Sequence, residues 1–195
     1  MSTLVLDTIQ DRVSSDSQSV TQVFSGWTKI ATQTASASAS IDFTSTHITS
    51  TYDKYCFAVE TLRPATDNVS LILRVSQGAG FLTATNYVYH SQVTNASASS
   101  YSGVNGTAAS GMIAGYLVGN DTHSFINAMV YLTNPANASS YPSMVWNSGF
   151  FGAGTVARGG AGQGYYGAAG ACDGVQFLMD SGNIADGSIT LYGLK

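Results

Sequence analysis

Short stretches in which apolar and polar residues alternate recur along the chain from Trp27 onward, separated by Gly, Asn, Asp and Ser. The clearest stretch covers residues 69–76, where every second side chain is Val or Leu. A period of two residues is typical of a β-strand that buries one face. No segment of helical length shows a convincing 3.6-residue period, so the pattern predicts strands throughout.

The same signal predicts eight more strands. They cover residues 41–43, 55–60, 86–93, 111–118, 124–132, 143–151, 174–179 and 188–194. Turns between strands are predicted at Asn105-Gly106, Asp173-Gly174 and Asp186-Gly187, since these pairs tolerate positive φ, and at residues 63–68. Many short strands with polar connections predict an all-β fold, namely a single antiparallel β-sandwich that is jelly-roll-like.

The first 26 residues follow a different pattern. A short apolar stretch holds Leu4, Val5, Leu6 and Ile9, and a polar run follows at residues 11–19. A short apolar stretch followed by a polar run is typical of a terminal arm that becomes ordered only when it docks on another protein. We therefore predict an extended N-terminal anchoring arm at residues 1–26 and a β-sandwich domain at residues 27–195.

Residues 149–170 stand out because nine of these 22 residues are Gly and only Arg158 is charged. The segment also holds two aromatic pairs, Phe150-Phe151 and Tyr165-Tyr166. We interpret the segment as a long loop. Because such a loop would leave apolar surface in water, the four aromatic residues are predicted to contact a neighbouring subunit.

Charged residues make up only 9% of the chain, with seven basic and eleven acidic residues and a net charge of −4. Scattered basic residues do not neutralise phosphates, so nucleic-acid binding is excluded. No apolar run is long enough for a membrane span, and the N-terminus predicts no secretory signal. The distant Cys56 and Cys172 lie in apolar strands, so we expect buried free thiols and folding in a reducing cytoplasm.

The sequence offers no pattern from which to assign a catalytic, cofactor-binding or metal-binding residue. His47, His90 and His123 lie far apart, and Glu60 is the only Glu. Residues 152–157 match the letters G-x-G-x-x-A, but a Gly-rich run follows where a dinucleotide site needs a helix. Residues from distant strands could still form a zinc site or a catalytic pair of carboxylates, and the sequence leaves both alternatives open. We nevertheless do not expect an enzyme. Trp146 fits a core strand better than a sugar-stacking site.

Three parts of the chain resemble bacteriophage virion proteins of the tail-fibre and capsid-appendage type. Residues 2–10 are similar to the anchor segment that begins many fibre proteins. Residues 51–55, 62–67 and 71–76 are similar to their β-domain, and residues 175–193 are similar to its two closing strands.

The resemblance implies a non-enzymatic structural protein of the virion, assembled in the host cytoplasm. It implies a trimeric, tail fibre-like surface appendage that contacts copies of itself and other tail or capsid proteins. One alternative is a capsid decoration (cement) protein that stabilises the head. An alternative of another class is a glycan-binding receptor domain, or a depolymerase, acting on a host surface glycan.

Overall fold

The computed structural model describes residues 26–78 and 80–195, except for the side chains of residues 98–100. Those residues form twelve β-strands and one short 3-10 turn (Ala153–Thr155), and they contain no α-helix. The predicted anchor residues Leu4, Val5, Leu6 and Ile9 lie outside the described residues.

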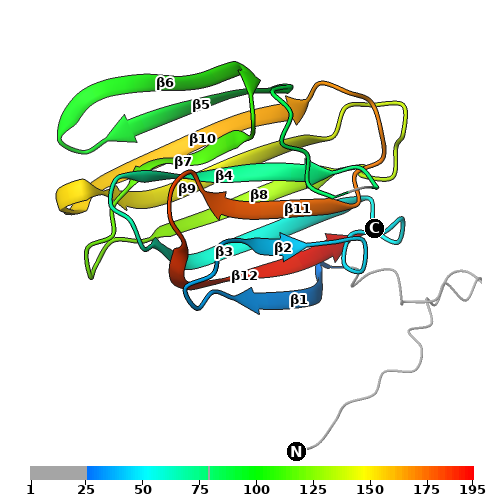
Figure 1. Cartoon of the computed structure of the whole chain (residues 1–195), viewed down its shortest axis with the longest axis horizontal. Helices are drawn as coiled ribbons and strands as arrows, with labels where there is room; N and C mark the ends of the chain where they lie inside the picture. Colours follow the sequence, from blue (N-terminus) through cyan, green and yellow to red (C-terminus); the bar gives the residue numbers. More distant parts are fainter. Residues whose placement is uncertain (1–25, 79) are drawn as a thin grey trace, which may run out of the picture.

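The strands form two sheets that pack face to face (Figure 1). All pairings between named strands are antiparallel, and a single residue pair, Val118↔Gly152, links the two sheets. The large sheet contains, in spatial order, β1 (Thr28–Thr34), β12 (Ile184–Leu194), β3 (Lys54–Pro64), β8 (Ile126–Thr133), β9 (Ser143–Gly152), β10 (Val156–Tyr166), β5 (Tyr87–Asn95) and β6 (Ala98–Ala109). The small sheet contains β7 (Met112–Val118), β4 (Val69–Ser76), β11 (Gly174–Met179) and β2 (Ile41–Phe43).

Most connections cross from one sheet to the other. From β1 to β5 each strand lies in the sheet opposite the strand before it, and the chain crosses again around β7 and β11. Repeated crossing between two antiparallel sheets is characteristic of a jelly roll. The prediction of an all-β, jelly-roll-like antiparallel sandwich is therefore confirmed.

The core lies between the sheets and is built from the inward side chains of both. Phe43, Phe57 and Phe177 come from three different strands, and their ring centroids lie 5.3–6.3 Å apart. Trp146 on β9 is fully buried beside them in the same hydrophobic cluster. The predicted core position of Trp146 is confirmed.

Several strand boundaries follow directly from the alternation of apolar and polar residues. The predicted strands 41–43, 69–76 and 174–179 coincide with β2, β4 and β11. The predicted turn at 63–68 joins β3 to β4, and Asn68 there has a φ of 61°.

The prediction of a long loop at 149–170 was wrong, because most of this segment is strand. Residues 149–152 end β9, and β10 then pairs with β9 on one side and β5 on the other. The glycines at 160, 162 and 164 alternate along β10 and face the interior. A Cβ on Gly162 would lie 2.7 Å from the Trp146 ring, and one on Gly164 would lie 2.6 Å from Met112 Sδ. Glycine therefore lets the core approach this strand closely.

Two predicted turns lie inside strands. Asn105-Gly106 belongs to β6, where Asn105 pairs with His90. Asp186-Gly187 lies in β12, where the register against β3 shifts twice. Gly187 adopts a φ of 106° at this bulge, so the Asp186-Gly187 pair does supply a positive φ. The pair lies at a bulge within one strand and does not form a turn between two strands.

Both cysteines are buried free thiols, as predicted. Burial raises the pKa of the Cys172 thiol to about 11. Burial also raises the pKa of Tyr87 to about 12, although its hydroxyl is fully hydrogen-bonded. This hydroxyl donates to the Leu82 carbonyl at 2.9 Å and accepts from the Val75 N–H at 3.0 Å, which fixes the loop before β5 to β4.

We expect Tyr87→Phe to lower the free energy of unfolding by about 1–3 kcal/mol at neutral pH, because it leaves the Val75 N–H and Leu82 carbonyl unpaired. A folded-state pKa above the ordinary value of about 10 stabilises the fold fully below pH 10. This contribution is lost as the pH rises from about 10 to about 12, so the difference between wild type and variant should narrow there.

Urea unfolding measured from neutral pH to about pH 12 tests this expectation. Tyr165→Phe is the matched control, because Tyr165 is exposed and its loss of a hydroxyl should change stability by less than about 0.5 kcal/mol. A difference between wild type and Tyr87→Phe that stays constant up to pH 12 would contradict the buried-phenol explanation.

Candidate functional site: an exposed face of the large sheet

Four adjacent strands of the large sheet present an outward face without charged residues. We define the outer face as the outward residues of β8, β9, β10 and β5. The register places four rows across these strands. The face consists of Asn127, Met129, Tyr131, Thr133, Ser143, Val145, Asn147, Gly149, Gly159, Ala161, Gln163, Tyr165, Val88, His90, Gln92 and Thr94. None of them is Asp, Glu, Lys or Arg.

The exposed large hydrophobic side chains of the described residues gather on this side of the molecule. Met129, Val145 and Tyr165 belong to the outer face itself, and Val145 is 49% exposed. Tyr141 stacks on Tyr165 with ring centroids 5.4 Å apart and an interplanar angle of 10°. Trp27 reaches over from the start of β1, and its ring lies 6.2 Å from that of Tyr131, also on the outer face.

The sixth exposed hydrophobic residue, Tyr101 on β6, extends the same side of the sheet. Tyr101 pairs with Thr94, an outer-face residue of β5. Exposed apolar side chains scattered singly are ordinary, whereas a contiguous group on one face marks an interaction surface. The outer face is therefore our candidate functional site.

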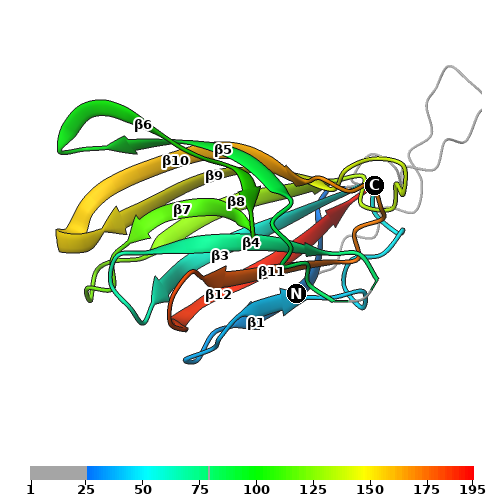
Figure 2. The same ribbon diagram turned by 45° about the horizontal axis from the view of Figure 1, so that its top comes forward.

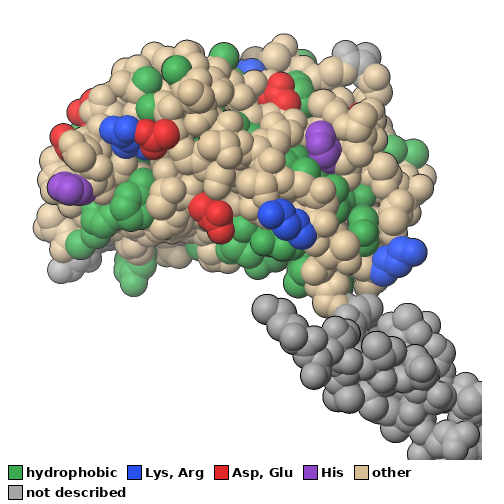
Figure 3. Space-filling view, turned by 90° about the horizontal axis from the view of Figure 1, so that it is seen from below, with side chains coloured by type: hydrophobic (Ala, Val, Ile, Leu, Met, Phe, Trp, Pro, Cys, Tyr) green, Lys and Arg blue, Asp and Glu red, His purple; other side chains and the backbone are tan. Residues whose placement is uncertain are grey.

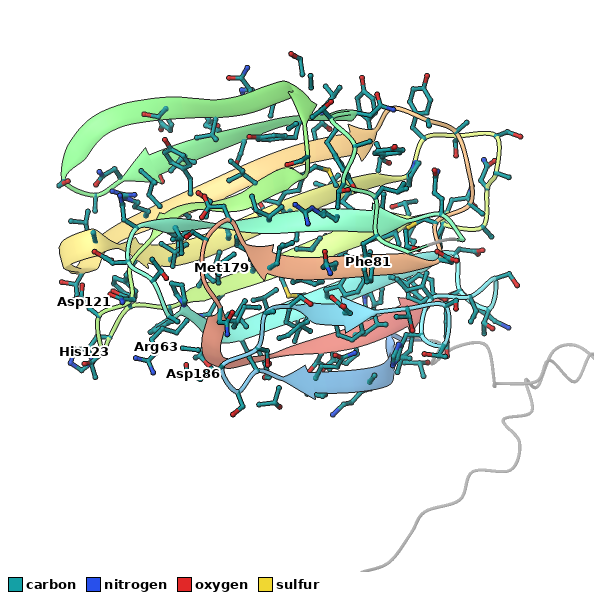
Figure 4. The ribbon with its side chains drawn as sticks, viewed as in Figure 1. Arg63, Phe81, Asp121, His123, Met179 and Asp186 are labelled. Carbon is teal, nitrogen blue, oxygen red and sulfur yellow. The ribbon has the colours of Figure 1, made fainter. Side chains whose placement is uncertain are left out.

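Charged groups lie around the outer face and at the ends of the sandwich. Lys54 and Glu60 occupy outward positions on β3, next to β8. Arg63 and Asp186 form an ion pair at the end of the sandwich where Asp121 and His123 also lie (Figure 4). Seen from the β1 edge, charged side chains are scattered among uncharged ones, and one basic and one acidic group touch (Figure 3).

A groove of about 310 Å³ crosses the outer face between β5, β10 and β9. Its walls combine apolar side chains with amide, imidazole and hydroxyl groups that can form hydrogen bonds. Its lining includes Val88, His90, Gln163, Tyr165, Ser143 and Val145.

The four aromatic residues predicted to contact a neighbouring subunit separate into two groups. Phe150 is buried in the chain's own core, and Tyr166 is buried against Tyr87 with ring centroids 4.9 Å apart. Phe151 is half-buried and packs on Phe125. Only Tyr165 lies exposed on the outer face. Subunit contact itself stays a prediction, and its surface shifts from the predicted loop to this face.

Val145, Met129 and Tyr141 were not among the residues predicted from the sequence to contact a neighbouring subunit. The sequence does carry a signal for Met129 and Val145, because β8 and β9 contain apolar residues at outward as well as inward positions. In β9, Val145 lies between the buried Met144 and Trp146. An apolar residue out of phase with the buried set indicates a strand that is apolar on both faces.

The three histidines lie in different surroundings. His90 and His123 are exposed, whereas His47 is half-buried, with its ring 5.6 Å from that of Phe43. In the described part of the chain, no three His, Cys, Asp or Glu side chains gather as metal ligands would. The described residues also include no helix with the length and apolarity that crossing a membrane requires.

Burial and one hydrogen bond act on Cys56, which lies on β3 beside the outer face and pairs with Tyr131. Burial raises the pKa of its thiol, and the hydrogen bond with Tyr131 opposes this shift. The thiol is therefore held in its neutral form next to an outer-face residue.

Comparisons with known family models, curated proteins and solved structures give no match to this chain.

Proposed function

We propose that this chain is a non-enzymatic structural protein of a bacteriophage virion that acts by assembling with copies of itself. The observation that carries the proposal is the outer face, which exposes Val145, Met129 and Tyr165 without a charged residue among its sixteen positions. The similarity of residues 2–10, 51–55, 62–67, 71–76 and 175–193 to phage appendage proteins supports the virion as the setting.

Three copies would pack their outer faces around a common axis and form a β-sandwich knob. The four strands of the outer face, spaced about 4.8 Å apart and about seven residues long, present roughly 440 Å². A standard interface takes roughly 800 Å² from each partner, so a stable contact would also use residues next to the outer face. The first 26 residues would attach this knob to the particle.

Two locations on the particle suit such a knob. A tail fibre-like appendage is our first choice, and it would be present in a dozen copies or so. A capsid decoration protein would instead be present in hundreds of copies and would raise the stability of the head. Counting the copies per virion by quantitative mass spectrometry separates the two.

Deleting residues 1–24 is the direct test of the arm. We expect the truncated chain to keep its fold and its number of copies per oligomer, because the described strands begin only at Thr28. We expect it to be absent from virions. Mass photometry of the full and truncated chains measures assembly, and the protein content of purified virions measures attachment. Incorporation at the normal copy number would contradict the anchor, and a monomeric full chain would contradict the trimer.

A second candidate function, binding of a host glycan, is favoured by the groove on the outer face. The stacked Tyr141 and Tyr165 offer an aromatic surface beside Gln163 and His90, a combination suited to a sugar ring and its hydroxyls. The groove and the proposed subunit contact use the same residues, so they exclude each other. A monomeric chain that is retained by host polysaccharide would favour glycan binding, and cleavage of that polysaccharide would indicate a depolymerase.

A further inference from the structure

Strand β6 forms one border of the large sheet (Figures 1 and 2). It has twelve residues, and among the described residues it pairs only with β5. Residues 101–106 pair one-to-one with β5, and the register shifts occur nearer the two ends of the strand. The other side of this regular stretch therefore presents backbone N–H and C=O groups without a strand partner in the described part of the chain.

The other border strands of the two sheets are short, carry a charged residue or are hydrogen-bonded to the opposite sheet. β2 has only three residues, and β7 meets β9 through Val118↔Gly152. β1 carries Lys29, and the Gln33 side chain joins it to the small sheet by donating to the Asp42 carbonyl at 2.6 Å.

Between the register shifts near its two ends, β6 carries none of the features that keep an edge from pairing. Its twelve residues contain no Lys, Arg, Asp, Glu or Pro. Folded proteins protect long edges with charges, proline or bulges, since an unprotected edge adds a strand from another chain. Tyr101 on β6 is also 72% exposed, the highest value among the exposed large hydrophobic residues described here. Among the described residues, none covers the free backbone edge of β6 or the Tyr101 side chain.

We propose that β6 is a self-association site at which two copies pair β6 with β6, antiparallel, across a two-fold axis. A two-fold contact requires a surface that complements itself, and a strand without charges meets its own copy without repulsion. The free N–H and C=O groups of one strand meet the same groups of the other, so the two large sheets become one continuous sheet. The partner strand also covers the region around Tyr101.

This contact is separate from the subunit contact proposed for the outer face. β6 lies at the border of the sheet, whereas Val145 and Met129 lie on strands β9 and β8, across β10 and β5 from β6. The two contacts can therefore be disrupted one at a time. An assembly that uses both links its three-fold units through pairs of β6 strands.

Hydrogen–deuterium exchange of the full chain at low and high protein concentration tests the proposal. We expect the amides of residues 101–106 that do not bond to β5, which are every second one, to exchange about fivefold more slowly once the total concentration exceeds the dissociation constant about tenfold, because pairing protects them by mass action. Ser102→Lys should remove this concentration dependence, since it places like charges across the two-fold axis. Ser139→Lys, in the exposed loop before β9, is the matched control and should leave it intact.

The wild-type measurement decides the proposal even if Ser102→Lys does not fold. Rapid exchange of the edge-facing amides at every concentration would overturn the pairing. Slow exchange of these same amides that persists on dilution would also overturn it, because the edge would then be covered from within the same chain. Loss of protection in Val145→Lys would show that β6 pairing depends on the outer face, which would contradict two independent contacts.

Discussion

Trp146→Ala should lower the free energy of unfolding by about 3–5 kcal/mol, a large part of the roughly 5–15 kcal/mol that stabilises a typical domain. The indole is fully buried and lies against Gly162, where even a Cβ would approach its ring to 2.7 Å. Its Nε1 has no hydrogen-bond partner among the described residues, so the substitution loses no hydrogen bond. The expected cost is the loss of apolar burial together with the cavity that remains.

Trp27→Ala is the matched control, because Trp27 is the only other tryptophan and is exposed on the outer side of the large sheet. We expect it to change stability much less than Trp146→Ala does. Urea unfolding followed by circular dichroism, at one protein concentration for all variants, compares the two. A loss below about 1 kcal/mol for Trp146→Ala would mean that the indole does not fill the core in the way described.

The fit between Trp146 and Gly162 also explains why one strand could not be predicted from the sequence. Glycine has low strand propensity, and a run with five Gly from 154 to 164 is typical of a loop. β10 is a strand because its neighbours on both sides pair with it and because its inward glycines admit the core. Both causes are tertiary interactions, so the strand propensity of the residues themselves does not predict β10.

Strands β1 and β6 escaped prediction for a related reason. β6 contains Ser, Gly, Ala, Asn and Thr, with Val104 and Tyr101 as its only large hydrophobic residues. A strand at a border buries little on its inner face, so the period of two is weak. The strands that were placed correctly, such as β4 and β11, lie in the small sheet, where burial on the inner face imposes a clear alternation.

The candidate site was predictable only in part. Composition indicated subunit contact through the low charge of the chain, and Tyr165 was among the predicted contact residues. The pairing register between β8, β9, β10 and β5 decides which residues share a face, and this register is set by long-range contacts that a single sequence does not show. The neighbouring Phe150 and Tyr166 face inward for the same reason.

Val145→Lys should convert the assembled protein to a smaller species, because a lysine at this position would be buried without a partner in the proposed contact. An unpaired buried charge costs about 3–5 kcal/mol. Each 1.4 kcal/mol is a tenfold change, so the dissociation constant should rise by about two to four orders of magnitude. Sedimentation velocity over a range of concentrations measures this change.

Val145 is half exposed on one chain, so the lysine should leave the fold of that chain intact, as circular dichroism would verify. Ser139→Lys adds the same charge in a loop away from the strands and should leave the sedimentation unchanged. An unchanged mass for Val145→Lys would place the subunit contact elsewhere and leave the outer face open for another ligand. The groove between Tyr165 and His90 would then become the stronger candidate, because its aromatic and polar groups stay accessible only while no second copy covers them.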